Sequence, residues 1–160
     1  MLFSKNTLKI SLSIIALLIA YFLVIASIGV ADKIYLSFLN APIMAAGLYF
    51  IIRSVYKSQP HNFKYMDGFL SGLASGFLIS VVFTVFMAIY LFEINPNLVQ
   101  EISASIPLAS GTDEVGLLLF VFLSGISTAI VSSLLIIPIF KQSWNTKGVR
   151  NSQKPLNQNS

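Results

Sequence analysis

The chain has 160 residues, of which 56% are hydrophobic and only 10% are charged, and its formal net charge is +4 at pH 7. A water-soluble domain could not cover so much apolar surface, and the absence of cysteine excludes disulfides, thiolate nucleophiles and cysteine metal sites. The basic residues lie at the edges of apolar runs and in the C-terminal tail, which favours membrane topology and argues against nucleic acid as a partner.

Four apolar runs are long enough to cross a bilayer, which takes roughly 20 residues for a core of about 30 Å. They cover residues 10–31, 34–52, 68–92 and 115–140. The first run follows two lysines and could instead be a cleaved signal peptide, but its apolar length of about 20 residues exceeds the roughly 7–15 of a signal sequence. We therefore expect a transmembrane helix here, with Gly29 able to end it before a tight hairpin.

The second run is the shortest and contains Asn40 and Pro42. Proline removes a backbone donor and predicts a bend in this helix. We expect the Asn40 amide to bond to a neighbouring helix or to the carbonyl that Pro42 leaves free. The alternative is that Asn40 lines a polar pathway together with serines of the fourth run.

Small residues recur at four-residue spacing on the third and fourth runs, where each row lies on one helix face. Such rows let two helix backbones approach closely, and close packing is what associates helices in lipid. The rows are Gly68, Gly72 and Gly76 on the third run, with Ser124, Thr128 and Ser132 and then Gly125, Ala129 and Ser133 on the fourth. They predict that the two helices pack on each other; the alternative is a homodimer through one row.

A short amphipathic helix is predicted in the loop between the third and fourth runs. Asn95 can cap it with Pro96 at its first position, and Leu98, Ile102 and Ile106 then form an apolar face. The helix could lie on the membrane surface, cover the end of the bundle or meet a partner. The tail over 141–160 is polar and predicted to be disordered.

Lysine and arginine are distributed asymmetrically about the four runs. All of them except Lys33 fall on one side, whereas Asp32, Glu93, Glu101, Asp113 and Glu114 fall on the other. Basic residues gather on the cytoplasmic side of a membrane. The predicted fold is thus an all-α membrane protein over 1–140, an antiparallel bundle of four transmembrane helices with both termini in the cytoplasm.

No residues for catalysis stand out, because none of the four runs contains an acidic or basic side chain. His61 is the only histidine, so a site of several imidazoles is unavailable within one chain. We therefore expect no enzyme, cofactor or metal site. The predicted function is that of a small accessory or structural membrane component, in contact with lipid and with a second copy or another membrane protein. The alternative is a small-solute transporter or channel subunit that works as an oligomer.

Three segments in the second half of the chain carry a resemblance to known proteins: 63–69 (FKYMDGF), 94–98 (INPNL) and 137–141 (IPIFK). With these segments the chain resembles a domain-of-unknown-function family of small four-span bacterial membrane proteins. It implies the four-span architecture in the bacterial inner membrane, and it implies no activity and no site residues.

Overall fold

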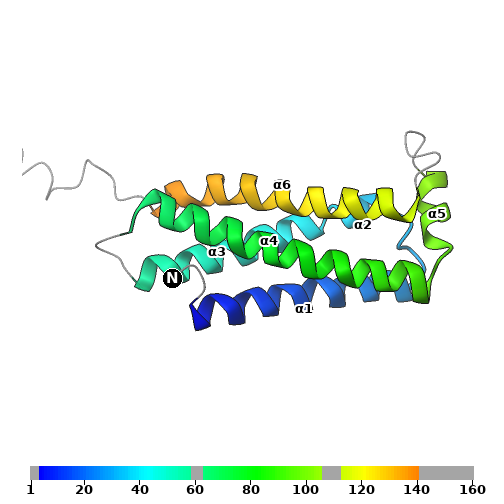
Figure 1. Ribbon diagram of the computed structural model, residues 1–160, viewed down its shortest axis with the longest axis horizontal. Coiled ribbons are helices and arrows are strands. Elements are labelled where there is room, and N and C mark those ends of the chain that lie inside the picture. The colour runs from blue at the N-terminus through cyan, green and yellow to red at the C-terminus, as the bar shows by residue number, and fades with distance from the viewer. Residues whose placement is uncertain (1–3, 59–62, 106–112, 141–160) are drawn as a thin grey trace, which may run out of the picture.

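The computed structural model describes residues 4–58, 63–105 and 113–140, and these residues form helices and the turns between them. The long helices lie along one axis as a bundle, with α5 across one end (Figure 1). In chain order the elements are α1 (Lys5–Ser27), α2 (Ile34–Ser37), α3 (Asn40–Ser58), α4 (Tyr65–Ile89), the π-helical turn η1 (Tyr90–Ile94), α5 (Leu98–Ser105) and α6 (Glu114–Phe140).

The centre of the bundle is formed by α3 and α4, which contact each other and each contact α1 and α6 as well. The largest interhelical contact joins α4 to α6. Four segments are long and apolar enough to cross a membrane: Lys5–Ser27, Tyr35–Ser58, Tyr65–Ile94 and Glu114–Phe140. The predicted all-helical bundle of four long apolar helices is therefore confirmed.

The side chains inside and outside this bundle are distributed differently from those of a soluble protein. Small and hydroxyl residues such as Gly72, Ser75 and Ser133 are buried between helices. Large apolar residues cover the outside, and Leu135 for example is 70% exposed. Large apolar residues also fill the centre, where Leu48 and Ile79 are fully buried. An apolar exterior over a partly polar interior suits a lipid solvent.

The first helix begins earlier and ends earlier than the predicted span over 10–31. Ser4 caps its start, where its hydroxyl oxygen accepts the Thr7 N–H at 3.2 Å. At the other end Gly29 has a φ of +76°, and the Val30 N–H donates to the Ile25 carbonyl at 3.1 Å. This pattern is a Schellman ending, in which the left-handed glycine closes the helix at Ser27.

The second predicted span, over 34–52, is broken by a turn at Phe38 and Leu39 and continues to Ser58. Pro42 lies in the first turn of α3, where backbone N–H groups have no intrahelical partner, so the proline causes no kink inside α3. The Phe38 carbonyl accepts the Ala41 N–H at 3.1 Å instead. The predicted bend takes the form of this interruption, which includes Phe38, the residue whose carbonyl the Pro42 ring crowds.

The third span extends beyond the predicted 68–92 at both ends, since α4 begins at Tyr65 and η1 continues to Ile94. The Asn95 N–H donates to the Tyr90 carbonyl at 2.9 Å, and this bond holds Asn95 in the final turn of that helix. The prediction that Asn95 caps the next helix is therefore wrong. The amphipathic helix exists as α5, but it begins at Leu98, which is buried together with Val99.

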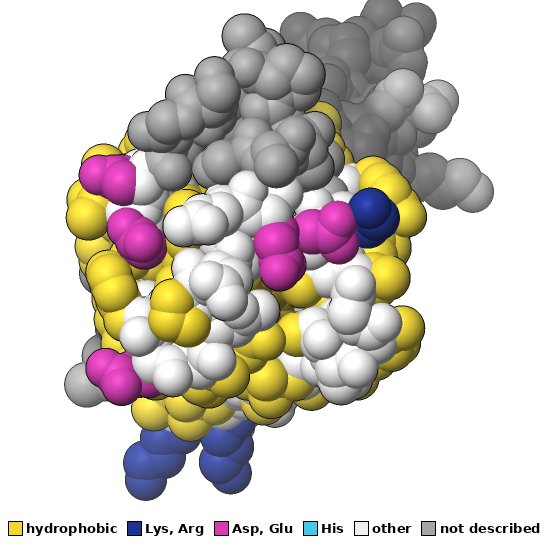
Figure 2. All heavy atoms as spheres, turned by 90° about the vertical axis from the view of Figure 1, so that its right-hand side faces the viewer, with side chains coloured by type: hydrophobic (Ala, Val, Ile, Leu, Met, Phe, Trp, Pro, Cys, Tyr) yellow, Lys and Arg dark blue, Asp and Glu magenta, His cyan; other side chains and the backbone are white. Residues whose placement is uncertain are grey.

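The two ends of the bundle differ in charge. The basic end carries Lys5, Lys9, Arg53, Lys57 and Lys64, with Asp67 among them, and the acidic end carries Asp32, Glu93, Glu101, Asp113 and Glu114, with Lys33 among them. Figure 2 shows the acidic end, where acidic side chains are scattered over the surface. Ile106 and the tail over 141–160 lie outside the described residues.

Candidate functional site

The contact between α4 and α6 brings the small residues of the two helices face to face. Gly72 lies against Ser133 and Gly76 against Ala129, in an antiparallel register. A Cβ atom added to Gly72 would overlap the Ser133 hydroxyl, and one added to Gly76 would overlap the Ala129 methyl group. The backbones approach this closely because neither glycine has a side chain. We call this contact the α4–α6 seam; its residues are Gly68, Gly72, Gly76, Ser80, Gly125, Ala129, Ser133 and Ile137.

Only one of the two small-residue rows on α6 belongs to this seam. Gly125, Ala129 and Ser133 face α4, and Gly125 lies against Ser80. Ser80 continues the Gly68, Gly72 and Gly76 row at the same spacing, so the row could have been extended from the sequence to include it.

The other row on α6 points elsewhere. Ser124 is exposed, and the Thr128 hydroxyl donates to the Ser124 carbonyl at 2.8 Å on its own helix. Both residues line a cavity of about 120 Å³, which also touches Asn40 and Ser80. The structure therefore brings Asn40 together with hydroxyl residues of α4 and α6. We call this space the Asn40 cavity.

The carboxamide of Asn40 makes no hydrogen bond within the described part of the chain, and its Oδ1 atom is buried. The expectation that it bonds to a neighbouring helix or to the carbonyl freed by Pro42 is therefore wrong. That carbonyl, of Phe38, already accepts the Ala41 N–H. An unpartnered amide group in apolar surroundings costs on the order of 1–3 kcal/mol in proteins, so Asn40 has a free-energy reason to bind a hydrogen-bonding group.

The chemistry that this cavity can support is hydrogen bonding without charge. The Ser80 hydroxyl donates to the Gly76 carbonyl at 2.8 Å, and Thr128 likewise donates to its own helix. Both hydroxyl oxygens can therefore still accept a bond, while the Asn40 amide can donate and accept. Among the residues that the structure describes, no acidic or basic side chain lines the cavity. Its lining suits a neutral polar group and provides no acid or base for proton transfer.

The Asn40 cavity reaches the flank of the bundle. Phe38 and Phe120 line it and are 68% and 56% exposed. Its inner wall consists of buried residues such as Leu18, Met44 and Ile79. A group from a neighbouring molecule would therefore enter from the side.

Metal binding and the charged groups of the acidic end bear on chemistry outside this cavity. Among the described residues, no group of three or more His, Cys, Asp or Glu side chains is placed to hold a metal ion. The acidic end contains an ion pair between Lys33 and Asp32 at 2.9 Å, and the hydrogen bond that Lys33 donates to the Asp32 carboxylate raises the pKa of Lys33. Lys33 therefore stays cationic at neutral pH.

Comparisons with protein-family models, curated proteins and solved structures find no match for this chain.

Proposed function

We propose that this chain is a four-span protein of the bacterial cytoplasmic membrane with both termini in the cytoplasm. The apolar exterior of the bundle supports placement in lipid, as do four segments of sufficient length. The difference in charge between the two ends supports the orientation, because basic residues resist translocation. The basic end then lies in the cytoplasm and the acidic end outside.

Within the membrane, the protein acts as a small accessory or structural component that associates with a partner or with a second copy. The observation that carries this proposal is the unpartnered Asn40 carboxamide in a cavity that reaches the flank. A polar residue on a neighbouring transmembrane helix could supply the missing hydrogen bond, and bonds of this type associate helices in lipid. The α4–α6 seam supports the monomer and is not available for association.

The chain has no cysteine, so a single introduced cysteine gives a clean background for crosslinking in membranes. Phe38→Cys places the thiol at the rim of the Asn40 cavity. We expect this variant to crosslink to a partner or a second copy, and we expect the added change Asn40→Leu to reduce the yield by about fivefold, corresponding to roughly 1 kcal/mol for an interhelical hydrogen bond.

The control is Leu12→Cys, which places a thiol on an exposed part of α1 that does not line the cavity. It should give little crosslinking, with or without Asn40→Leu. Equal yields at positions 38 and 12 would contradict association through the cavity. Thermal unfolding of Asn40→Leu in detergent checks that the monomer remains folded.

The second candidate is a subunit of an oligomeric transporter or channel for a small neutral solute. It is favoured by the same cavity, because hydrogen-bonding groups from three helices converge there without charge. On this hypothesis Asn40→Leu abolishes solute flux into liposomes while the fold remains intact. If the natural protein shows no flux, or if Asn40→Leu leaves its flux unchanged, the accessory role is the better proposal.

A further inference from the structure

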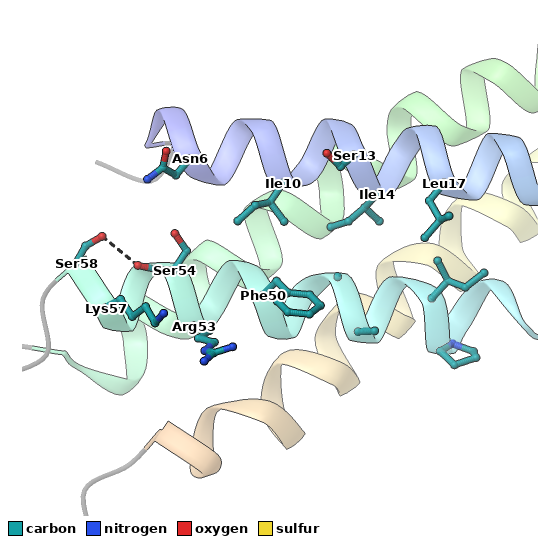
Figure 3. Close-up of a pocket in the computed structure, with 14 residues that line it drawn as sticks. Asn6, Ile10, Ser13, Ile14, Leu17, Phe50, Arg53, Ser54, Lys57 and Ser58 are labelled. Carbon is teal, nitrogen blue, oxygen red and sulfur yellow. Dashed lines mark hydrogen bonds between the residues drawn. The ribbon is translucent and has the colours of Figure 1, made fainter.

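A second hollow lies on another flank of the bundle, between α1 and α3, with a volume of about 900 Å³ (Figure 3). Gly47 brings the two helices together at its floor, since a Cβ atom there would lie 2.5 Å from the Ile14 side chain. Ile10, Ile14 and Leu17 extend from α1 toward α3, and Phe50 lies on the α3 side (Figure 3). Most of this α1–α3 groove is thus apolar.

One end of the α1–α3 groove is polar and positively charged. Arg53 and Lys57 line it on successive turns of α3, together with Ser54 and Ser58. Both cationic side chains are exposed, and within the described residues neither forms an ion pair with an acidic side chain. The groove therefore presents two unneutralised positive charges beside an apolar channel.

We infer that this groove binds an anionic phospholipid, with the headgroup phosphate at Arg53 and Lys57 and an acyl chain along Ile14, Leu17 and Phe50. The inference rests on the proposed membrane placement. Guanidinium and ammonium groups are common phosphate ligands, and basic pockets between transmembrane helices on the cytoplasmic side suit acidic headgroups. The polarity of the groove changes along its length in the order of a phospholipid, from charged head to apolar tail.

The dimensions of the groove agree with one lipid leaflet. Along α3, the rise from Arg53 to Ile43 is about 15 Å at roughly 1.5 Å per residue. That length is half of a hydrocarbon core of about 30 Å. The volume of about 900 Å³ falls within the range of roughly 300–1,000 Å³ typical of ligand sites. An apolar partner helix in the groove would instead leave both cations unpaired.

The headgroup contact can be tested by titrating the purified full chain in detergent with phosphatidylglycerol or phosphatidylcholine of identical acyl chains and counting bound lipid by native mass spectrometry. We expect the natural protein to prefer phosphatidylglycerol. The double variant R53Q/K57Q should bind phosphatidylglycerol about 20- to 30-fold more weakly, since each basic residue contributes about 1 kcal/mol to binding of anionic lipid. Its affinity for phosphatidylcholine should fall less, because the choline group of that lipid offsets the charge of its phosphate.

The matched control is K9Q/K64Q, which removes the same charge from the same end of the bundle but from residues that do not line the groove. Its phosphatidylglycerol binding should stay within about twofold of the natural protein. An equal loss in both double variants would assign the preference to overall charge and overturn the inference. Equal binding of the two lipids by the natural protein would overturn it as well.

The acyl-chain contact is tested by Ala46→Trp, which places an indole in the groove from an exposed position on α3. We expect this variant to bind both lipids roughly tenfold more weakly, as loss of contact with about two methylene groups would produce. The control Ala20→Trp places the same ring on an exposed face of α1 outside the groove and should have no effect.

Two outcomes separate this inference from the proposed function. Release of the protein from membranes by alkaline carbonate would contradict membrane placement itself, whereas retention without any lipid preference would contradict only the lipid site. Crosslinking of an Ala46→Cys variant to another protein chain in membranes would assign the groove to a protein partner. Displacement of bound lipid by inorganic phosphate alone would show a simple anion site; either result would overturn the proposal for a phospholipid.

Discussion

At the scale of single residues, this bundle depends on the absence of side chains at a few positions. Gly72 and Gly76 leave room that Ser133 and Ala129 of α6 occupy. Close packing of this kind replaces the hydrophobic driving force that a soluble bundle would have, because lipid is as apolar as the helices themselves. A single added carbon atom on either glycine therefore meets an occupied position.

The contact between Gly76 and Ala129 gives a prediction that isolates one pair. Gly76→Ala should destabilise the monomer by about 1–3 kcal/mol, because the new methyl group overlaps that of Ala129. Adding Ala129→Gly should recover part of this loss by vacating the space. The double-mutant cycle should show a coupling of about 1 kcal/mol or more in thermal or denaturant unfolding in detergent.

The control for that cycle combines Gly76→Ala with Ala20→Gly, since Ala20 is exposed on α1. These two changes should be additive. Additivity in the Gly76–Ala129 pair as well would contradict the register of the α4–α6 seam.

At the scale of helices, their boundaries are set by local hydrogen bonds as much as by apolar length. Because Gly29 is left-handed, α1 ends at Ser27, four residues before the apolar run ends at residue 31. The turn at Phe38 and Leu39 separates α2 from α3. Just before this turn, the Tyr21 hydroxyl of α1 donates to the Leu36 carbonyl of α2 at 2.8 Å. The interruption of the second span is thus stabilised by the first helix.

The ending of α1 predicts different effects for two substitutions at one position. Gly29→Ala should lower stability by about 1 kcal/mol, because an L-residue with a β-carbon is strained at a φ of +76°. Gly29→Asn should cost less, since asparagine tolerates the left-handed conformation. Apart from Gly29 and its chain neighbours, no atom of the described residues lies within 4 Å of an added Cβ, so the difference reports backbone strain. Equal unfolding midpoints for the two variants would contradict the Schellman ending.

At the scale of the whole molecule, charge is separated along the bundle axis. The acidic end and the basic end lie at opposite ends of four apolar helices, and this separation is the basis of the proposed orientation. It also places the two cations of the α1–α3 groove on the side that would face the cytoplasm.

The topology predicts the outcome of reporter fusions. Reporters placed after Lys57 and after Lys147 should report the cytoplasm, and one inserted at Ser105 should report the outside. The physical reason is that basic residues flanking short loops resist translocation. A cytoplasmic signal at Ser105 would contradict the four-span topology. A mature chain shorter by about 30 residues, seen by mass spectrometry, would instead indicate cleavage of the first run as a signal peptide.

The number of long apolar helices follows from the sequence alone, because run length and composition decide whether a helix can cross lipid. The small-residue row of Gly68, Gly72 and Gly76 was also visible, since helix periodicity places it on one face. The sequence could not show which of the two small-residue rows on α6 faces this row, because both have the same four-residue spacing. Rotation of α6 about its axis decides that question, and rotation depends on packing against α3 and α4 together.

The polar groups inside the bundle likewise depend partly on the sequence and partly on the tertiary structure. Sequence marked Asn40 as the most polar residue within a span, but it predicted a bonded amide where the fold leaves the oxygen unpartnered. The α1–α3 groove had no sequence signal, because Ile14 of α1 joins Phe50 and Arg53 of α3 in a common surface only when α1 packs beside α3. Local chemistry thus determined the helices and their charged ends, whereas the cavities depend on contacts between residues distant in the chain, which only the tertiary structure decided.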